Sequence, residues 1–146
     1  MTWATERLDA VIGGGAELPP VVETLRLGTL DAWGPGWTRK TWRASREVLN
    51  VDGSMFGGYI AALADQTLAF AAMTVLPDGA VYRTAHLQVQ FFRVTRGEDL
   101  TIEGRVVAQS RTTIAVEAEL RTGDVLVAKA SALQIIQPRH RPPAGT

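Results

Sequence analysis

The sequence contains no cysteine, and its 146 residues include only two histidines, His86 and His140. The absence of cysteine excludes disulfide bonds, a thiolate nucleophile and cysteine-ligated zinc or iron–sulfur sites. With so few histidines, a histidine-rich metal site is not expected, and a Ser-His-Asp triad would have to be built on His86 alone. The sequence therefore predicts no metal and no resident cofactor.

Neither charge sign is in excess, because 15 Lys and Arg residues balance 15 Asp and Glu residues. This balance is not typical of proteins that bind nucleic acids or anionic membranes, so we expect neither partner. The N-terminus carries acidic residues and no long apolar run. It is unlike a signal peptide, and we expect a cytoplasmic protein. Length and composition indicate one globular domain over residues 1–146.

The N-terminal third shows weak periodicity interrupted by turn signals. Residues 2–12 have apolar side chains spaced for one face of a short amphipathic helix, which the glycines that follow would end. We assign residues 1–20 to this helix and a stiff, proline-containing connector. Residues 21–45 are compatible with two weak strands separated by a Gly-Pro-Gly turn. At the other end, residues 138–146 are expected to be a loose tail.

A long apolar segment occupies residues 57–76, where sixteen of twenty residues are apolar or glycine. Its length would suffice to span a membrane, but Asp65 and Gln66 near its middle would be costly in lipid. A helix buried nearly all round within the protein explains the composition better.

The period changes to two after this helix. Residues 84–91, 100–106 and 114–120 alternate between apolar and polar, and residues 125–136 form a longer strand. Four successive strands joined by turns predict an antiparallel meander, and wrapping the sheet around the helix would bury it: an α+β fold. The alternation places His86 on the same strand face as Thr84, where a solvated side chain is its simpler interpretation.

Asp65 requires an explanation, since burying a carboxylate is costly unless a partner stabilises it. It could be a structural residue bonded to a neighbouring Thr or Arg, or in contact with water. It could also be a reactive group, and we favour this interpretation because a carboxylate in such a position is more often a working group. Gly58, Ala61 and Ala62 lie on the same helix face and leave room for another backbone or a ligand, although close packing against the sheet also explains small residues.

The pair Gly57-Gly58 stands at the expected start of this helix. Backbone N–H groups there lack intrahelical acceptors and could stabilise an anion or a developing oxyanion, although the pair could also be only a flexible entry turn. Gly57 and Asp65 are eight residues apart, about 12 Å along a helix, too far to act on one carbonyl. Two copies running antiparallel about a two-fold axis could combine them, so a shared site would require at least a dimer.

Residues 50–65, which contain Gly57-Gly58 and then Leu-Ala-Asp65, resemble the signature of hotdog-fold acyl-CoA thioesterases of the phenylacetate-degradation (PaaI-like) type. In that family an Asn and a Gly precede His-Gly-Gly at the start of the central helix, and Leu-x-Asp follows. Residues 84–93 resemble the family's Ser/Thr-x-Asp-Leu strand, and the similarity extends over about residues 45–137. The resemblance implies a hotdog fold, an antiparallel sheet wrapped around one long helix.

The resemblance also implies catalytic roles. Asp65 would be the general base or nucleophile at the thioester carbon, and the Gly57 amide of the other subunit would polarise the carbonyl. Asn50, in the loop before the helix, would position substrate or water. Thr84 would orient the water. This set is a base plus an oxyanion donor, in agreement with the interpretation of the residues themselves.

For substrate binding, the resemblance points to Gly58, Phe56, Tyr59 and Phe70. Phe56 stands where the family usually has His, which we interpret as a change in substrate range or rate. Arg111 is a candidate contact for the phosphates of coenzyme A, although a solvated turn arginine explains it more simply.

The leading hypothesis is therefore an acyl-CoA thioesterase that acts as a homodimer or a dimer of dimers, with coenzyme A as part of its substrate. A hotdog hydratase or dehydratase is a weaker alternative, because such relatives usually depend on a His near the helix and this segment has none. A protein that binds acyl-CoA or fatty-acyl groups in the same cleft without turnover is the non-enzymatic alternative.

Overall fold

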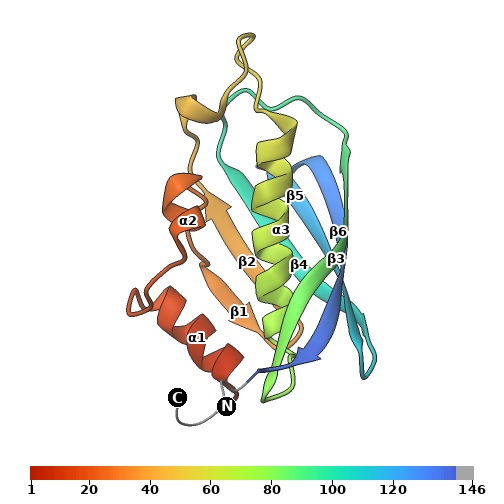
Figure 1. The fold of residues 1–146 in the computed structure, drawn as a ribbon. Helices are drawn as coiled ribbons and strands as arrows, with labels where there is room; N and C mark the ends of the chain where they lie inside the picture. The colour runs from red at the N-terminus through yellow and green to blue at the C-terminus, as the bar shows by residue number, and fades with distance from the viewer. Residues whose placement is uncertain (141–146) are drawn as a thin grey trace.

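The computed structural model describes residues 1–140, which form one curved sheet, a central helix and an N-terminal helical layer (Figure 1). In chain order the elements are α1 (Trp3–Ile12), α2 (Pro20–Thr24), β1 (Ala32–Gly34), β2 (Trp37–Trp42), the 3₁₀ turn η1 (Arg46–Val48), α3 (Gly57–Met73), β3 (Ala80–Phe91), β4 (Leu100–Gln109), β5 (Thr113–Thr122) and β6 (Val125–Pro138).

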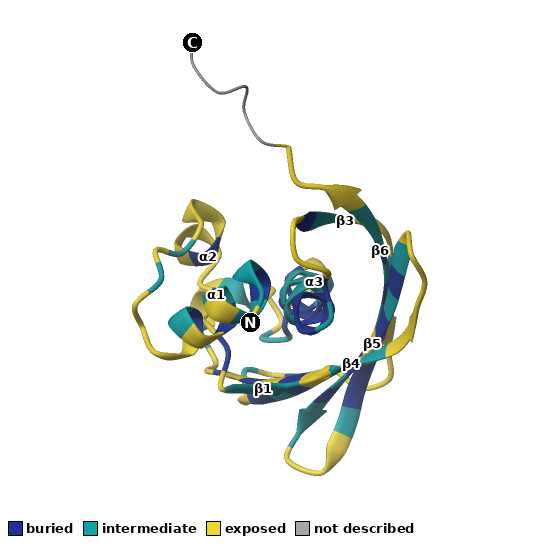
Figure 2. Cartoon of the chain, turned by 90° about the horizontal axis from the view of Figure 1, so that it is seen from below, coloured by how far each residue is buried: buried dark blue, intermediate teal, exposed yellow. Residues whose placement is uncertain are grey.

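The sheet has six antiparallel strands in the order β1-β2-β4-β5-β6-β3 and curves around α3 (Figure 2). This arrangement confirms the α+β hotdog fold. Leucine, isoleucine and valine side chains of β4 and β5 point inward and are fully buried against the helix, including Leu100, Ile102, Ile114, Val116 and Leu120. The predicted alternation of the strands is thus the alternation between core and surface.

The order of the strands differs from the predicted meander. Of the four strands predicted for the meander, β4, β5 and β6 follow one another as neighbours, whereas β3 lies at the sheet edge beyond β6. The connection from β3 to β4, residues 92–99, has eight residues and is longer than the short loops that join hairpin strands. It therefore crosses one end of the sheet, from the edge strand β3 to β4, and the two strands do not form a hairpin.

The N-terminal layer begins with the predicted helix, α1. Thr2 is its N-cap residue, and the Thr2 hydroxyl oxygen accepts a hydrogen bond from the Thr5 N–H. The short helix α2 was not predicted, because residues 21–45 were expected to start with a strand. Pro20 is the first residue of α2, a position where proline's missing N–H costs nothing. The Gly-Pro-Gly segment does turn the chain, between β1 and β2.

The central helix α3 starts at Gly57 as predicted and ends at Met73, three residues before Leu76. The hydroxyl of Thr74 donates to the Ala71 carbonyl at 2.7 Å and helps to end the helix there. The prediction that the helix is buried nearly all round is wrong on one side. We call its two sides the covered face (Leu63, Ala64, Thr67, Leu68, Ala71 and Ala72), which is buried, and the open face (Gly58, Ala61, Ala62, Asp65 and Ala69), which is partly or fully exposed.

A β-bulge interrupts β3. Thr84 is opposite Gln134 of β6, but His86 is opposite Leu133, so Ala85 is an extra residue. Because consecutive residues of β6 point to opposite faces, Thr84 faces the helix and His86 faces outward. The prediction that the two share a face is therefore wrong.

The C-terminal strand is longer than the sequence suggested. β6 continues to Pro138, where Ala80 of β3 is its partner, so the tail does not begin at 138. Residues 141–146 of the expected tail lie outside the described residues.

Candidate active site

Asp65 lies on the open face of α3, where it is only half-buried. The Thr84 hydroxyl of β3 donates to its Oδ1 at 3.3 Å. The two residues predicted to act together are thus brought into contact by the packing of α3 against the inner face of β3. Since the carboxylate has both a donor and access to solvent, it is not an isolated charge in the core.

Gln134 of β6 completes this polar group and was not predicted from the sequence. Its side chain is fully buried, and its Oε1 lies 3.1 Å from the Thr84 Oγ1. Its Nε2 has no hydrogen-bond partner among the described residues. The signal available in the sequence was a glutamine within a long apolar strand, where an unpaired amide would be costly.

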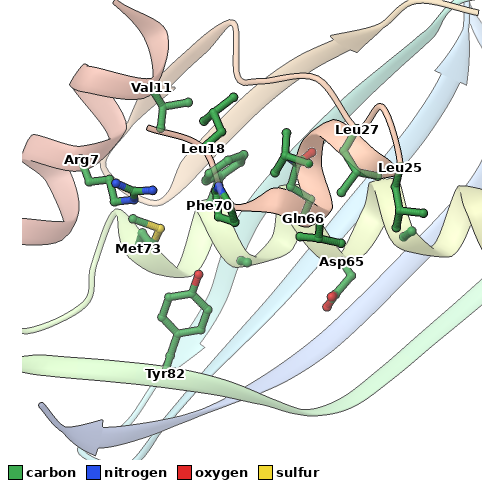
Figure 3. A pocket seen from close by; sticks show the side chains of 15 residues that line it. Arg7, Val11, Leu18, Leu25, Leu27, Asp65, Gln66, Phe70, Met73 and Tyr82 are labelled. Atoms are coloured by element: carbon green, nitrogen blue, oxygen red, sulfur yellow. The ribbon is translucent and has the colours of Figure 1, made fainter. Parts of the chain in front are cut away.

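A cavity of about 320 Å³ adjoins Asp65, between the N-terminal layer, α3 and β3 (Figure 3). Most of its lining is apolar and comes from α1, α2, their connecting segments and α3: Val11, Leu18, Pro19, Val21, Val22, Leu25, Leu27, Ala62, Ala69, Phe70 and Met73. Asp65, Gln66, Arg7 and Tyr82 are its polar members. Figure 3 shows Arg7 beside Met73, away from Asp65 along the helix. An apolar group of moderate size attached to an atom near Asp65 fits such a space.

Tyr82 points its hydroxyl toward the cavity from β3 (Figure 3). Burial raises the pKa of Tyr82 to about 12, and the negative charge of Asp65 acts in the same direction. The hydroxyl therefore remains protonated at neutral pH and is available to donate a hydrogen bond into the cavity.

Gln66, next to Asp65, is fixed by a buried lysine. The Lys40 ammonium, fully buried on β2, donates to Gln66 Oε1 and to the Leu27 carbonyl, and Gln66 Nε2 donates to the Gly28 carbonyl at 3.0 Å. Desolvation lowers the pKa of Lys40 to about 7, against a smaller opposing effect of Asp31. This network connects β2, α3 and the segment after α2, and so holds one wall of the cavity in place.

The first turn of α3 has unoccupied donors. Its N-cap, Phe56, provides no side-chain hydrogen bond, and no hydrogen bond found among residues 1–140 uses the N–H of Gly57 or Gly58. These N–H groups lie at the positive end of the helix dipole, where an anion or oxyanion is stabilised. Phe56 itself is 59% exposed.

The loop before α3 is held by its own polar groups. Asn50 Nδ2 donates to the Ser54 hydroxyl at 3.1 Å, and the Ser54 N–H and hydroxyl both donate to Asp52. These bonds from Ser54 lower the pKa of the exposed Asp52 carboxyl. Gly53 has a φ of +83°, a left-handed conformation that favours glycine. Asn50 is thus exposed and its amide is engaged within the loop.

The glycines at the start of α3 adjoin aromatic rings. A Cβ placed on Gly58 would lie 2.8 Å from the Phe56 ring, which is too close, and one on Gly57 would lie 3.4 Å from the Phe91 ring at the end of β3. Within one chain, Gly57 remains two helical turns from Asp65, so the structure does not bring these two predicted residues together.

Two further predicted contacts lie elsewhere. Tyr59 is buried, donates its hydroxyl to the Arg26 carbonyl at 2.9 Å and packs edge-on against Trp42, with ring centroids 5.5 Å apart. It stabilises the core and does not line the cavity, because its ring packs against Trp42 and its hydroxyl is directed to the Arg26 carbonyl near the start of the helix. Arg111 is exposed on the turn between β4 and β5 and is likewise not part of the cavity lining.

Within residues 1–140, no group of three or more His, Cys, Asp or Glu side chains is arranged to bind a metal ion. In the same part of the chain, none of the helices has the length and apolar character needed to cross a membrane.

Comparison with known proteins identifies relatives. The model of the thioesterase superfamily matches residues 52–129. A phenylacetic acid degradation-related protein from Ralstonia eutropha is 28% identical, with a TM-score of 0.79 over 88% of this chain and 98% of that chain. No curated protein matches the sequence.

More distant structures share the fold. A thioesterase family protein from Silicibacter pomeroyi is 20% identical, with a TM-score of 0.79 over 92% of this chain and 98% of that one. A thioesterase from Haemophilus influenzae is 17% identical, with a TM-score of 0.73 over 79% of this chain and 81% of that one.

Proposed function

Because the chain belongs to the thioesterase superfamily, we propose that it hydrolyses an acyl-CoA thioester to a carboxylic acid and coenzyme A. One observation carries the proposal: Asp65, oriented by the Thr84 hydroxyl, stands at the edge of an apolar cavity. A carboxylate base beside a space for an apolar acyl group is the arrangement that thioester hydrolysis requires.

The chemistry needs only groups of the protein and water. In one form, Asp65 accepts a proton from a water molecule as the water oxygen attacks the thioester carbon. The carbon–sulfur bond then breaks, and the thiolate of coenzyme A receives the proton. In the other form, Asp65 attacks the carbon itself, and the carbon–sulfur bond breaks to release the thiolate of coenzyme A and leave a mixed anhydride. Water then hydrolyses the anhydride to the carboxylic acid and the free Asp65 carboxylate, and the proton released goes to the thiolate. Thr84 fixes the carboxylate in both.

The acyl group would occupy the cavity beneath the N-terminal layer, in contact with Phe70 and within reach of the Tyr82 hydroxyl. The coenzyme A portion would remain at the molecular surface, where Arg111 stays a candidate phosphate contact. The apolar lining favours acyl groups that lack charge near the thioester.

A second copy of the chain would supply the oxyanion donor. β3 has twelve residues and, among residues 1–140, pairs only with β6, so within that range its other edge presents unpaired N–H and C=O groups. Large apolar side chains are exposed near the end of this strand, among them Phe91, Phe92 and Val94, which are 51%, 51% and 68% exposed. Both features favour antiparallel pairing of β3 with β3 of a second copy.

The pairing register follows from which side chains share a face. Pairing centred on Gln88 places Leu87 opposite the partner's Val89, both on the inner face. The bulge then brings Thr84 opposite the partner's Phe91, because one extra residue lies between them on this strand. Thr84 contacts Asp65, and Phe91 adjoins Gly57, so this register would bring Asp65 close to the partner's Gly57 amide.

A single introduced cysteine tests this register, since the natural chain has none. In the proposed dimer, Gln88→Cys faces its own copy at a Cα distance of about 4.5–5.5 Å, within disulfide range. Mild oxidation should therefore yield a covalent dimer. The matched control is Gln90→Cys on the same strand, whose two copies would be about 14 Å apart and should not crosslink. Crosslinking of Gln90→Cys alone, or of neither variant in a protein that is monomeric in solution, would refute the register.

Activity is tested with a panel of acyl-CoA substrates and the variant Asp65→Asn. Loss of a general base or nucleophile should lower kcat by about 100-fold or more. Asp124→Asn, an exposed aspartate on the turn between β5 and β6, should retain the wild-type rate. Equal rates for wild type and Asp65→Asn on every substrate would remove Asp65 from the mechanism.

The exposed Phe56 favours a second candidate function, binding of acyl-CoA without turnover. This position is usually His in the family that the sequence resembles, whereas the phenyl ring here offers no hydrogen bond to a substrate. Calorimetric binding of acyl-CoA with no release of free thiol would support this alternative, and clear turnover would exclude it.

A further inference from the structure

Gln134 is a buried polar side chain with no evident structural need. Its strand neighbours are Thr84 on β3 and Ile114 on β5, and Ile114 has no polar side-chain atom. The Thr84 hydroxyl is the only side-chain partner found for Gln134 among residues 1–140. A fully buried amide that does nothing would be replaced at a gain in stability by an apolar residue. Its position one hydrogen bond from Thr84 and two from Asp65 suggests what it does.

Hydrogen counting decides how the three groups are connected. The Thr84 hydroxyl has one hydrogen, but Asp65 Oδ1 at 3.3 Å and Gln134 Oε1 at 3.1 Å are both acceptors, so it can serve only one. Rotation of the carboxamide by 180° exchanges Oε1 and Nε2 and moves no neighbouring group. Nε2 then donates to Thr84, and Thr84 donates to Asp65. Both short contacts become hydrogen bonds, and the unpaired buried atom becomes a carbonyl oxygen, which proteins tolerate better than an unpaired N–H.

We propose that Gln134 is a positioning residue: its carboxamide donates to the Thr84 hydroxyl and thereby directs the single hydroxyl hydrogen of Thr84 to Asp65. The chain of donors holds Oδ1 of Asp65 in place and leaves Oδ2 free to face the cavity. Without Gln134 the hydroxyl could rotate away, and the carboxylate would lose its fixed orientation. The inference rests on the proposed hydrolase function for its consequence in catalysis, but the hydrogen-bond chain is a property of the protein alone.

The kinetic test uses Gln134→Met, which keeps the length of the side chain and removes its hydrogen bonds. We expect kcat to fall about tenfold, the equivalent of one hydrogen bond to a charged group, while KM stays within about twofold. Thr84→Val should have a similar effect, and the double variant should lose no more than Thr84→Val alone, because Gln134 acts through Thr84. Thr84→Ser, which restores the hydroxyl, should restore the sensitivity to Gln134→Met. Gln137→Met, exposed on the same strand, is the matched control.

A second measurement does not depend on activity. In NMR spectra of the wild-type protein, the side-chain amide of Gln134 should show slow hydrogen exchange, and its resonances should move in Thr84→Val but not in Thr84→Ser. If the protein hydrolyses no thioester, the proposed function fails and this measurement alone decides the hydrogen-bond chain. The proposal is overturned if Thr84→Val leaves the Gln134 resonances unchanged, or if an active, folded Gln134→Met keeps the wild-type kcat.

Discussion

The covered face of α3 packs against the concave side of the sheet and satisfies its polar groups within the chain, whereas the open face leaves donors and acceptors free. On the covered face, the Thr67 hydroxyl donates to the Leu63 carbonyl, and the Thr67 carbonyl accepts from Thr38. On the open face, Asp65 has one protein donor and a cavity beside it. One helix therefore separates the residues that stabilise the fold from those whose polar groups remain accessible and to which we assign the proposed function.

The largest expected contrast is in stability. Leu68 is fully buried on the covered face, so Leu68→Ala should lower the free energy of unfolding by about 2–5 kcal/mol. Asp65→Asn on the open face should change it by less than about 0.5 kcal/mol, because the amide oxygen still accepts from Thr84. Urea denaturation monitored by circular dichroism measures both. A comparable loss of stability in Asp65→Asn would show that the open face is structural as well.

Lys40 of β2 is an ionisable side chain that is fully buried. It should make the free energy of unfolding depend on pH. Its pKa is about 7 in the folded protein, against 10.5 for an ordinary lysine. Between these values the unfolded chain binds a proton that the folded chain lacks, so stability rises with pH. From pH 7 to 9 the gain should be about 2 kcal/mol.

Urea midpoints measured across this range for wild type and Lys40→Met provide the test. The rise attributed to Lys40 should disappear in Lys40→Met and persist in Lys129→Met, a change at an exposed lysine. The same slope in wild type and Lys40→Met would show that Lys40 does not titrate in this range.

The smallest expected effect is at Phe56, which is exposed beside the free N–H groups of the open face. Phe56→His introduces a hydrogen-bond donor there and should raise kcat about fivefold, the contribution of one modest hydrogen bond. Steady-state assays on the best substrate of the panel measure it, with Val125→His as a control at an exposed apolar residue at the start of β6. A fall in kcat would indicate that the phenyl ring itself contacts the substrate.

The sequence was sufficient to predict the elements that depend on local periodicity. Alternation identified the four long strands, and an apolar run that begins at Gly57 and contains Asp65 identified the central helix. The short helix α2 was missed because five residues carry too little periodic signal, and its stability comes from packing, as for Val22. The edge position of β3 was missed because strand order depends on long-range pairing, which local patterns do not report.

The candidate site was predictable only in part, for the same reason. Motif spacing singled out Asp65 and Thr84, and the structure places them in contact. Gln134 is fifty residues from Thr84 in sequence and belongs to no motif, so only the pairing of β3 with β6 reveals it. Tyr59 illustrates the converse error: it stands next to the motif, but its ring packs against Trp42 and its hydroxyl donates to the Arg26 carbonyl, contacts that no motif reports.

The extra residue in β3 has a consequence of a different kind. Removing Ala85 would leave Thr84 inward and His86 outward, since the residues on either side already alternate correctly without it. What the deletion would remove is the bend and extra twist that a bulge gives to its strand, next to the residue that contacts Asp65. Deletion of this one residue would therefore change how Thr84 is presented to Asp65 while retaining every side chain of the candidate site.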